Sequence, residues 1–246
     1  MSPLSIPGKM VLKKESATAD PYYDNVSLLL HGDGTNGSTT IVDNSPSPKT
    51  MTALGNAQIS TTESLFGGSS LYFDGSGNDA IQTLPGNDFV YGTGPFTLEA
   101  WIYYQGKGNG GYDGAIIYAQ TVGGVNYFYV FLDTIGDKFL FSWGIGGGAY
   151  LVTTGSVPRN VWTHVAVCRE GTGTNQTRLF INGSVEAVGT VSFDFSNTTY
   201  VPTVGNYSHS FNALPYKGYI DDFRITKGIA RYTSNFTPPT APFWPT

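Results

Sequence analysis

The chain has 246 residues, enough for one all-β domain or for two smaller domains. Charged residues make up only 13% of it, about half of the ~25% that is usual in globular proteins, whereas glycine is abundant with 32 residues. This composition excludes helical bundles, coiled coils and charge-driven disorder, and the net charge of −5 argues against a nucleic-acid partner.

Cys168 is the single cysteine of the sequence, so neither an intramolecular disulfide nor a cysteine-based zinc cluster can form. It lies in the apolar run 165–168, which favours a packing role over a reactive thiol. Residues 1–20 lack the apolar stretch of a secretion signal, and no run of ~18 apolar residues is present to span a membrane. We therefore expect a soluble product made in a cytoplasm, without membrane insertion.

Residues 1–20 differ from the rest of the chain. They contain Lys9, Lys13 and Lys14 together with prolines, and they show no strand pattern. They are either a frayed terminus or an extended arm that becomes ordered against a neighbouring subunit. In both cases the predicted domain comprises residues 21–246.

From Tyr22 onward, short apolar segments recur with Gly, Asn, Asp and Pro between them. Many short strands with regular turns are typical of a sandwich or barrel, and the lack of long amphipathic segments argues against parallel βαβ units. The predicted strands comprise residues 26–31, 69–73, 96–103, 115–120, 127–133, 138–143, 149–153, 161–169, 177–181, 185–188 and 218–226.

Local patterns refine two of these strands. Asn182 and Gly183 stand between two apolar runs and predict a type I′ hairpin, because both turn residues must have positive φ. In the segment 138–143, Phe139, Phe141 and Trp143 share one face by the two-residue period of a strand.

The tail that begins at Thr237 is too rich in proline to form a strand. We expect it to lie across the surface, with Phe243 and Trp244 as its anchors.

Four motifs occur in the order in which one known family has them. They are S-L-Y-F-D-G at 70–75, F-T-L-E-A-W-I at 96–102, W-T-H-V-A-V at 162–167 followed by L-F-I-N-G at 179–183, and G-Y-I-D-D-F-R-I at 218–225. They resemble the motifs of laminin-G-like domains, which are jelly rolls of the concanavalin A type. The resemblance covers about residues 22–242 and implies an all-β fold, a two-sheet antiparallel β-sandwich.

Two further segments narrow the resemblance, D-P-Y-Y-D-N-V-S-L-L-L-H at 20–31 and I-T-K-G-I-A-R-Y-T-S-N-F-T-P-P at 225–239. Both are similar to segments of laminin-G-type proteins that bacteriophages encode. Those relatives are virion proteins, namely tail fibres, head fibres or capsid decorations. The resemblance, and no argument from composition, implies a location on the virion.

The sequence shows no recognisable catalytic set. Glycoside hydrolysis, which the same sandwich supports in laminarinase-type enzymes, needs two carboxylates that flank the scissile bond. None of the glutamates has the E-x-D-x-x-E spacing of those enzymes: Glu15, Glu63, Glu99, Glu170 and Glu186. His31, His164 and His209 lie on separate segments, and the motifs of nucleophile elbows, zinc proteases and P-loops are missing. We expect His164 to be a hydrogen-bonded structural residue and the protein not to be an enzyme.

Calcium is the candidate cofactor, because the resemblance implies a cation site at the rim of the sandwich or beside the closing strand. Asp33 and Asp43 lie in the first turn-rich region, and Asp221 and Asp222 lie on the last predicted strand, which neighbours the first strand in such a sandwich. Carboxylate oxygens are ligands of calcium, so these four residues are the predicted metal site. The alternative is that Asp221 accepts hydrogen bonds from the protein and Asp33 holds a turn.

Strict alternation along the last strand would put Tyr219, Asp221, Phe223 and Ile225 on one face and Asp222 on the other. An aspartate among aromatic and aliphatic side chains must be paired or hydrogen-bonded, because a bare buried charge is costly.

Aromatic side chains supply the candidate sugar site. Carbohydrate-binding sites stack aromatic rings on the apolar face of the sugar and add a few hydrogen bonds. Tyr103, Tyr129 and Trp143 lie on central predicted strands or near their ends, and we predict them as carbohydrate-binding residues. The alternative is that such aromatic residues fill the core or cover subunit contacts.

The sequence favours a non-enzymatic virion protein, exposed as a fibre or decoration component, with residues 1–20 docked on other virion proteins. Its outward face either binds host surface glycans or only reinforces the shell. Copies are expected to associate into a homo-oligomer, for which a trimer is one arrangement. The alternatives are a secreted bacterial glycan-binding adhesin, which would need an export signal, and a polysaccharide-degrading enzyme, which would need a carboxylate pair.

Overall fold

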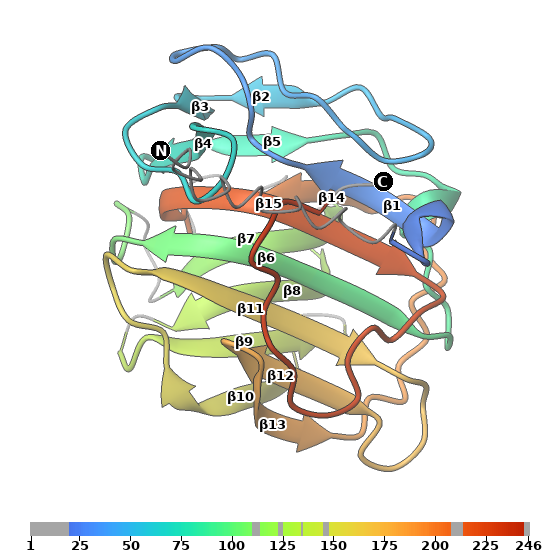
Figure 1. Cartoon of the computed structure of the whole chain (residues 1–246). Helices are drawn as coiled ribbons and strands as arrows, with labels where there is room; N and C mark the ends of the chain where they lie inside the picture. Colours follow the sequence, from blue (N-terminus) through green and yellow to red (C-terminus); the bar gives the residue numbers. More distant parts are fainter. Residues whose placement is uncertain are drawn as a thin grey trace, which may run out of the picture.

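The computed structural model describes residues 20–109, 114–122, 125–133, 135–144, 148–207 and 214–243. These residues form a sandwich of two antiparallel sheets, one of eight strands and one of seven (Figure 1). Helical structure in them is limited to two 3-10 turns, η1 (Tyr23–Asn25) and η2 (Asn87–Phe89), and none is long enough to cross a membrane. The predicted all-β jelly roll is confirmed.

The eight-stranded sheet has the strand order β13-β12-β11-β6-β15-β4-β3, and β1 pairs with β15 beyond the end of β4. As predicted, the first and last strands are therefore neighbours. Its strands are β1 (Val26–Leu30), β3 (Gln58–Ser60), β4 (Ser70–Asp74), β6 (Phe96–Tyr104), β11 (Trp162–Arg169), β12 (Thr177–Ile181), β13 (Ser184–Gly189) and β15 (Lys217–Lys227).

The seven-stranded sheet has the strand order β10-β9-β8-β7-β14-β5-β2. Its strands are β2 (Thr52–Leu54), β5 (Ala80–Gln82), β7 (Gly114–Val122), β8 (Val125–Asp133), β9 (Lys138–Trp143), β10 (Ala149–Ser156) and β14 (Val201–Val204).

The core lies between the sheets and is rich in phenylalanine. The ring of Phe128 lies 6.0 Å from Phe96, 5.6 Å from Phe141 and 5.2 Å from Phe195, measured between ring centroids. Burial of a side chain of this size contributes about 1.5–3 kcal/mol. Trp143 packs on the edge of this core beside Phe141, so the predicted shared face of this strand is confirmed.

The predicted Asn-Gly hairpin joins β12 and β13. Asn182 has φ of 48° and Gly183 has φ of 76°, as a type I′ turn requires. A Cβ atom on Gly183 would lie only 1.9 Å from the carbonyl oxygen of Phe236, so the turn also needs glycine for lack of space.

The closing strand β15 does not alternate regularly. Asp221 pairs with Trp101 and Arg224 pairs with Glu99, so β15 advances three residues while β6 advances two. The extra residue is Asp222, which has φ of 47°. The predicted common face of Tyr219, Asp221, Phe223 and Ile225 is therefore wrong, because Phe223 and Ile225 lie in the core. Beyond the bulge, the outward side chains of β15 are instead those of Arg224 and Thr226.

After β15 the chain crosses the outer face of the eight-stranded sheet (Figure 1). We call residues 229–243 the C-terminal strap. Its backbone bonds to the β12–β13 turn through Phe236 and to the Asp222 carboxylate through Phe243, whose side chain is buried. The predicted anchor Phe243 is confirmed, whereas Trp244 and residues 1–19 of the predicted arm lie outside the described residues.

Candidate functional site

Four aromatic side chains form a row across four neighbouring strands, on the outer face of the eight-stranded sheet. Tyr72 on β4 pairs with Tyr219 on β15, Tyr219 pairs with Tyr103 on β6, and Tyr103 pairs with Trp162 on β11. The ring centroids of consecutive members are 4.9, 5.8 and 5.6 Å apart. We call these four residues the aromatic row.

The aromatic row is only partly covered by the protein. Tyr72, Tyr103 and Trp162 are half-buried, and Tyr219 in the middle of the row is buried between its neighbours. Burial raises the pKa of the Tyr219 hydroxyl, and the neighbouring Tyr72 raises it further, so Tyr219 is an uncharged phenol at neutral pH. Half-exposed rings in register offer a continuous apolar surface with hydroxyl groups at its edge.

A polar pocket adjoins the Tyr72 end of the row. The pocket has a volume of about 320 Å³, and its lining combines the Tyr72 ring with amide, hydroxyl and carboxylate groups. Its lining residues are Thr39, Gly55, Asn56, Ala57, Gln58, Tyr72 and Asp74.

Asp74 is held as a carboxylate at this pocket. Burial by itself would raise its pKa, but hydrogen bonds from Asp79, Ser76 and Asn56 lower the pKa of Asp74 to about 2. The Asn56 amide nitrogen lies 2.8 Å from Asp74 Oδ2. The exposed Lys217 faces Asp74 across the sheet, so charged groups of both signs border the row on this side.

Asp79 supports this pocket from inside. It is fully buried and accepts hydrogen bonds from the backbone of Asn56 at 2.7 Å and of Asp74 at 2.8 Å. Burial, together with the hydrogen bond to Asp74, raises the pKa of Asp79 to about 6. Since Asp79 is inaccessible, it positions the pocket and does not line it.

The loop 61–69 covers the sheet beside the aromatic row. Asp221 accepts hydrogen bonds from the backbone nitrogens of Leu65 at 2.8 Å and Phe66 at 3.0 Å, and the Phe66 ring packs edge-on against Trp101. Burial raises the pKa of Asp221 to about 7 despite these two donors, and the negative charges of Asp222 and Asp33 contribute to the shift. Asp221 therefore holds this loop, as the alternative interpretation of this residue expected.

Glu99 is the centre of a buried ionic cluster under the C-terminal strap. Its carboxylate accepts hydrogen bonds from Arg224 at 2.7 and 2.9 Å and from the Tyr232 hydroxyl at 2.8 Å, and His164 Nε2 lies 3.2 Å from it. Burial by itself would raise the pKa of Glu99, but the charge of Arg224 and the His164 hydrogen bond hold it below its usual range. Both carboxylate oxygens are engaged, so Glu99 is a structural anion, and the prediction of a hydrogen-bonded His164 is confirmed.

The same cluster fixes the point at which the chain enters the domain. Asp20 accepts hydrogen bonds from Arg224 at 3.0 Å and from Arg231 of the strap at 2.8 and 2.9 Å.

Cys168 is a free thiol packed beneath the strap, and burial raises its pKa to about 12. Its predicted packing role is confirmed.

The four aspartates predicted as a calcium site do not form one group. Asp43 accepts hydrogen bonds from the backbone nitrogens of Leu29, Ser45 and Lys49, at distances between 2.7 and 3.1 Å. It therefore organises the segment 43–49.

The other three aspartates lie near the junction of β1, β15 and the loop 61–69. Asp222 bonds to His31 Nδ1 and accepts a hydrogen bond from the backbone of Phe243. Asp33 follows β1 and its carboxylate lies against Gly67 of the loop 61–69. Within the described residues, no group of three or more His, Cys, Asp or Glu side chains is arranged to hold a metal ion. Calcium binding stays a prediction.

The three predicted sugar-binding residues lie in three different places. Tyr103 belongs to the aromatic row. Tyr129 lies on the outer face of the seven-stranded sheet, 5.2 Å from Phe131 between ring centroids, and Trp143 packs on the core. The third histidine, His209, is outside the described residues.

Sequence reasoning did not find the other three members of the row, Tyr72, Tyr219 and Trp162. The alternating pattern places Tyr72 and Tyr219 on outward faces of their strands. A search for outward aromatic residues, one on each neighbouring strand, would have found the row, but it requires the strand order.

Comparison with known families agrees with this architecture. Residues 74–230 match the family model Laminin_G_3, described as the concanavalin A-like lectin/glucanases superfamily, and the chain belongs to this family. No curated protein sequence matches the chain.

Among solved structures, binding domains of clostridial toxins have the same fold. The binding domain of Paraclostridial Mosquitocidal Protein 1 is 15% identical with a TM-score of 0.62, and the match covers 85% of this chain and 50% of that one. The binding domain of Botulinum Neurotoxin DC is also 15% identical, and its two structures each match over 85% of this chain and 49% of their own. The TM-score is 0.58 for its complex with SialylT and 0.59 for its complex with rat synaptotagmin II. The chain thus spans about half the length of the domains that it matches.

Proposed function

We propose that this chain is a non-enzymatic attachment module of a bacteriophage particle and that it binds a surface glycan on the aromatic row. The observation that carries the glycan part is the row itself, with a polar pocket at one end. The family to which the chain belongs is described by lectins and glucanases, so carbohydrate is the ligand class that supports this proposal best.

The dimensions of the aromatic row suit an oligosaccharide. Neighbouring strands are about 4.8 Å apart, so four rings on four strands cover about 14 Å. Rings stack on the apolar faces of sugar units, and Asn56, Gln58 and Asp74 supply donors and acceptors for hydroxyl groups at one end. We therefore expect a short chain of sugars, with its end in the pocket beside Tyr72.

Four of the carboxylates around the row, those of Glu99, Asp79, Asp221 and Asp74, favour binding over hydrolysis. Hydrolysis needs a proton donor and a second carboxylate on opposite sides of the glycosidic bond. Glu99 is engaged by Arg224 and Tyr232, Asp79 is fully buried, and Asp221 holds a loop backbone. Asp74 is the carboxylate that reaches the polar pocket, and its low pKa makes it an acceptor of hydrogen bonds and no proton donor at neutral pH.

The virion part of the proposal comes from the resemblance of residues 20–31 and 225–239 to phage proteins. The fold offers a consistent geometry for it. Asp20, where residues 1–20 join the domain, is bound to Arg231, which also bonds to Thr226 near the end of β15. Tyr219 of the aromatic row lies near the start of the same strand, about 20 Å away along an extended chain. Asp20 and the aromatic row thus lie toward opposite ends of β15, an arrangement that suits a protein that links a particle to a cell.

Glycan binding is tested with an array of bacterial surface oligosaccharides and with titration calorimetry on the best ligand. We expect Tyr103→Ala and Trp162→Ala to weaken binding about tenfold, because an aromatic contact contributes up to about 1.5 kcal/mol beyond its buried area and about 1.4 kcal/mol corresponds to a factor of ten. Tyr129→Ala is the matched control, since it removes an equal ring from the other sheet. Loss of binding in the control alone, or in none of the three variants, would overturn the proposed site.

The virion location has its own test. Antibody detection of the chain in purified particles would support it, and deletion of residues 1–19, which keeps Asp20, should give a folded domain that no longer enters particles. Incorporation of the truncated chain would refute the role of the arm. Secretion by bacteria without any particle would favour the adhesin, which uses the same row.

A further inference from the structure

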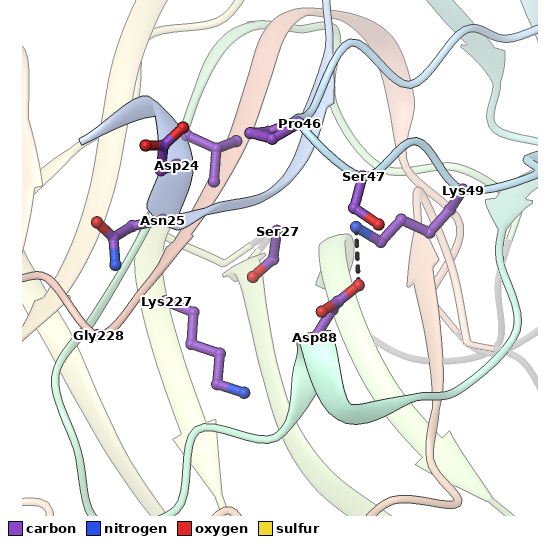
Figure 2. Close-up of a pocket in the computed structure, with 10 residues that line it drawn as sticks. Asp24, Asn25, Ser27, Pro46, Ser47, Lys49, Asp88, Lys227 and Gly228 are labelled. Carbon is purple, nitrogen blue, oxygen red and sulfur yellow. Dashed lines mark ion pairs between the residues drawn. The ribbon is translucent and has the colours of Figure 1, made fainter. Parts of the chain in front are cut away.

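A second pocket lies at the far end of β15, away from the aromatic row. It has a volume of about 340 Å³ and opens between the start of β1, the end of β15, the segment 46–49 and η2 (Figure 2). Its lining residues are Asp24, Asn25, Val26, Ser27, Pro46, Ser47, Lys49, Asp88, Lys227 and Gly228.

Lys49 forms one wall of this pocket, and its ammonium group has one ion-pair partner among the described residues. Its side chain is only 12% exposed, and Nζ lies 2.9 Å from Oδ2 of Asp88, which is 50% exposed. An ammonium group has three N–H donors. Apart from the ion pair, the described residues provide no hydrogen-bond acceptor for the buried Lys49 Nζ. The ammonium is thus placed to donate to a ligand.

The buried carboxylate of Asp43 fixes the backbone position of Lys49. Its backbone nitrogen donates to Asp43 Oδ2 at 2.7 Å, and the same carboxylate binds Ser45 and the β1 backbone at Leu29. This explains what the buried Asp43 does: it holds the segment that forms one side of the pocket. A preorganised wall lowers the entropic cost of binding.

A smaller pocket adjoins the first one across the Lys49–Asp88 ion pair, which lines both. It has a volume of about 270 Å³ and offers hydroxyl groups together with an apolar surface that includes the exposed Leu84. Its other lining residues are Thr50, Thr83, Pro85, Gly86 and Phe89.

The lining charges select the ligand class. Lys49 and Lys227 are balanced by Asp24 and Asp88, so the larger pocket has no excess of either sign. Figure 2 shows the two lysines approaching from opposite sides, and Lys227 Nζ donates to the carbonyl of Asn87. An anion would meet the two carboxylates, and a cation would meet the two ammonium groups. A sugar hydroxyl both donates and accepts, so it satisfies either kind of partner.

We propose that the two pockets form a second saccharide site for an uncharged glycan, with one sugar unit in each pocket and the Lys49–Asp88 pair hydrogen-bonded between them. This inference does not depend on the aromatic row, because the two sites share no residue and lie at opposite ends of β15. A chain with both sites would hold one glycan at two points, or two glycans at once, and gain avidity.

The test compares variants on an array of neutral and acidic oligosaccharides and then on crystals soaked in the best neutral ligand. Lys49→Met keeps the buried stem and removes the ammonium, and we expect it to weaken binding of neutral glycans at least tenfold in a Trp162→Ala background, where the aromatic row is disabled. Lys138→Met, which removes an ammonium bound to the carbonyl of Thr154 elsewhere, is the matched control and should change nothing.

A second variant distinguishes loss of the pocket from loss of the fold. Ser47→Phe fills the pocket from an exposed position and leaves both residues of the ion pair in place, so it should block the same glycans with an unchanged Tm. Electron density for sugar units on either side of the Lys49–Asp88 pair would support the site directly. If Trp162→Ala abolishes all binding while Lys49→Met and Ser47→Phe have no effect in the wild-type background, this inference fails and the proposed function stands. If the pocket variants abolish binding while Trp162→Ala has no effect, the row fails and the pocket stands.

Discussion

The outer face of the eight-stranded sheet has a region that the chain itself covers and a region that is half-exposed. Toward β12 and β13 it is covered by the C-terminal strap, where Phe236 and Tyr232 pack on Phe180 and the charge of Glu99 is matched by Arg224. Along the aromatic row the described part of the chain leaves Tyr72, Tyr103 and Trp162 half-exposed beside polar groups. The same kind of sheet face is therefore interior under the strap and surface at the row. The path of the tail, more than the composition of the strands, therefore decides where a ligand has access.

The largest effect is expected from breaking the charge balance on the covered side. Glu99→Ala leaves Arg224 and Arg231 to share Asp20 and leaves the Tyr232 hydroxyl and His164 without their acceptor. Removing one partner of a buried ionic cluster costs about 3–5 kcal/mol, so the free energy of unfolding should fall by that amount in urea titrations.

Glu186→Ala is the control for this variant. Glu186 accepts hydrogen bonds from Thr154 and Gly155 near the surface, and its loss should cost about 1 kcal/mol. An equal loss in both variants would show that the Glu99 cluster does not stabilise the covered side.

The loop beside the aromatic row predicts a pH effect. An unfolded aspartate releases its proton near pH 4, whereas native Asp221 holds it to about pH 7, so the native state binds more protons between these values. Stability should therefore decrease as the pH rises from 5 to 7, by at most about 2.7 kcal/mol, which is two pH units at 1.36 kcal/mol each.

Asp221→Asn keeps an acceptor for the backbone of Leu65 and Phe66 and removes the titration. Its stability should be less dependent on pH in this window, with the part that remains due to Asp79, whose pKa is raised to about 6. A wild-type curve that is flat or rises from pH 5 to 7 would contradict the raised pKa of Asp221.

The smallest effect is expected from loosening the strap alone. Phe236→Ala removes a half-buried ring that stacks on Tyr232 and packs on Phe180, and it should cost about 1–2 kcal/mol, less than a fully buried phenylalanine. The Cys168 thiol under the strap should react faster with a thiol reagent in this variant, because local opening exposes it.

Thr237→Ala, next to it on the exposed side, should leave the labelling rate of Cys168 as in the wild type. Glycan binding at the aromatic row should be the same in both strap variants. A strap variant that loses glycan binding would show that the two parts of the face are coupled.

The sequence was sufficient for the long strands and for the fold class. Segments such as 96–103 and 161–169 show the alternation or the bounded apolar run of a strand, and the Asn182–Gly183 turn has its own signature. The short strands β2, β3, β5 and β14 were missed. Three residues are too few to show a period, and β14 contains Pro202, which argues against a strand.

The candidate sites depended on information that local patterns do not carry. Tyr103 was predicted, but its neighbours Tyr219 and Trp162 lie far from it in sequence and meet it, together with Tyr72, only through the strand order β4-β15-β6-β11. Tyr129 and Trp143 have the same composition signal and lie in the other sheet. Likewise, Lys49 gave no signal as a binding residue, because its partner Asp88 comes from a turn on the other side of the pocket.

The extra residue in β15 has a consequence for how this chain tolerates length changes. Without Asp222, Asp221 would be followed by Phe223 and Arg224 in ordinary alternation, so every later side chain would keep its side of the sheet. What would disappear is the carboxylate that binds His31 just after β1 and the backbone of Phe243 in the tail. A one-residue deletion would thus spare the framework and release the tail from the opening segment, and homologues that lack this residue should fasten their C-termini by other means.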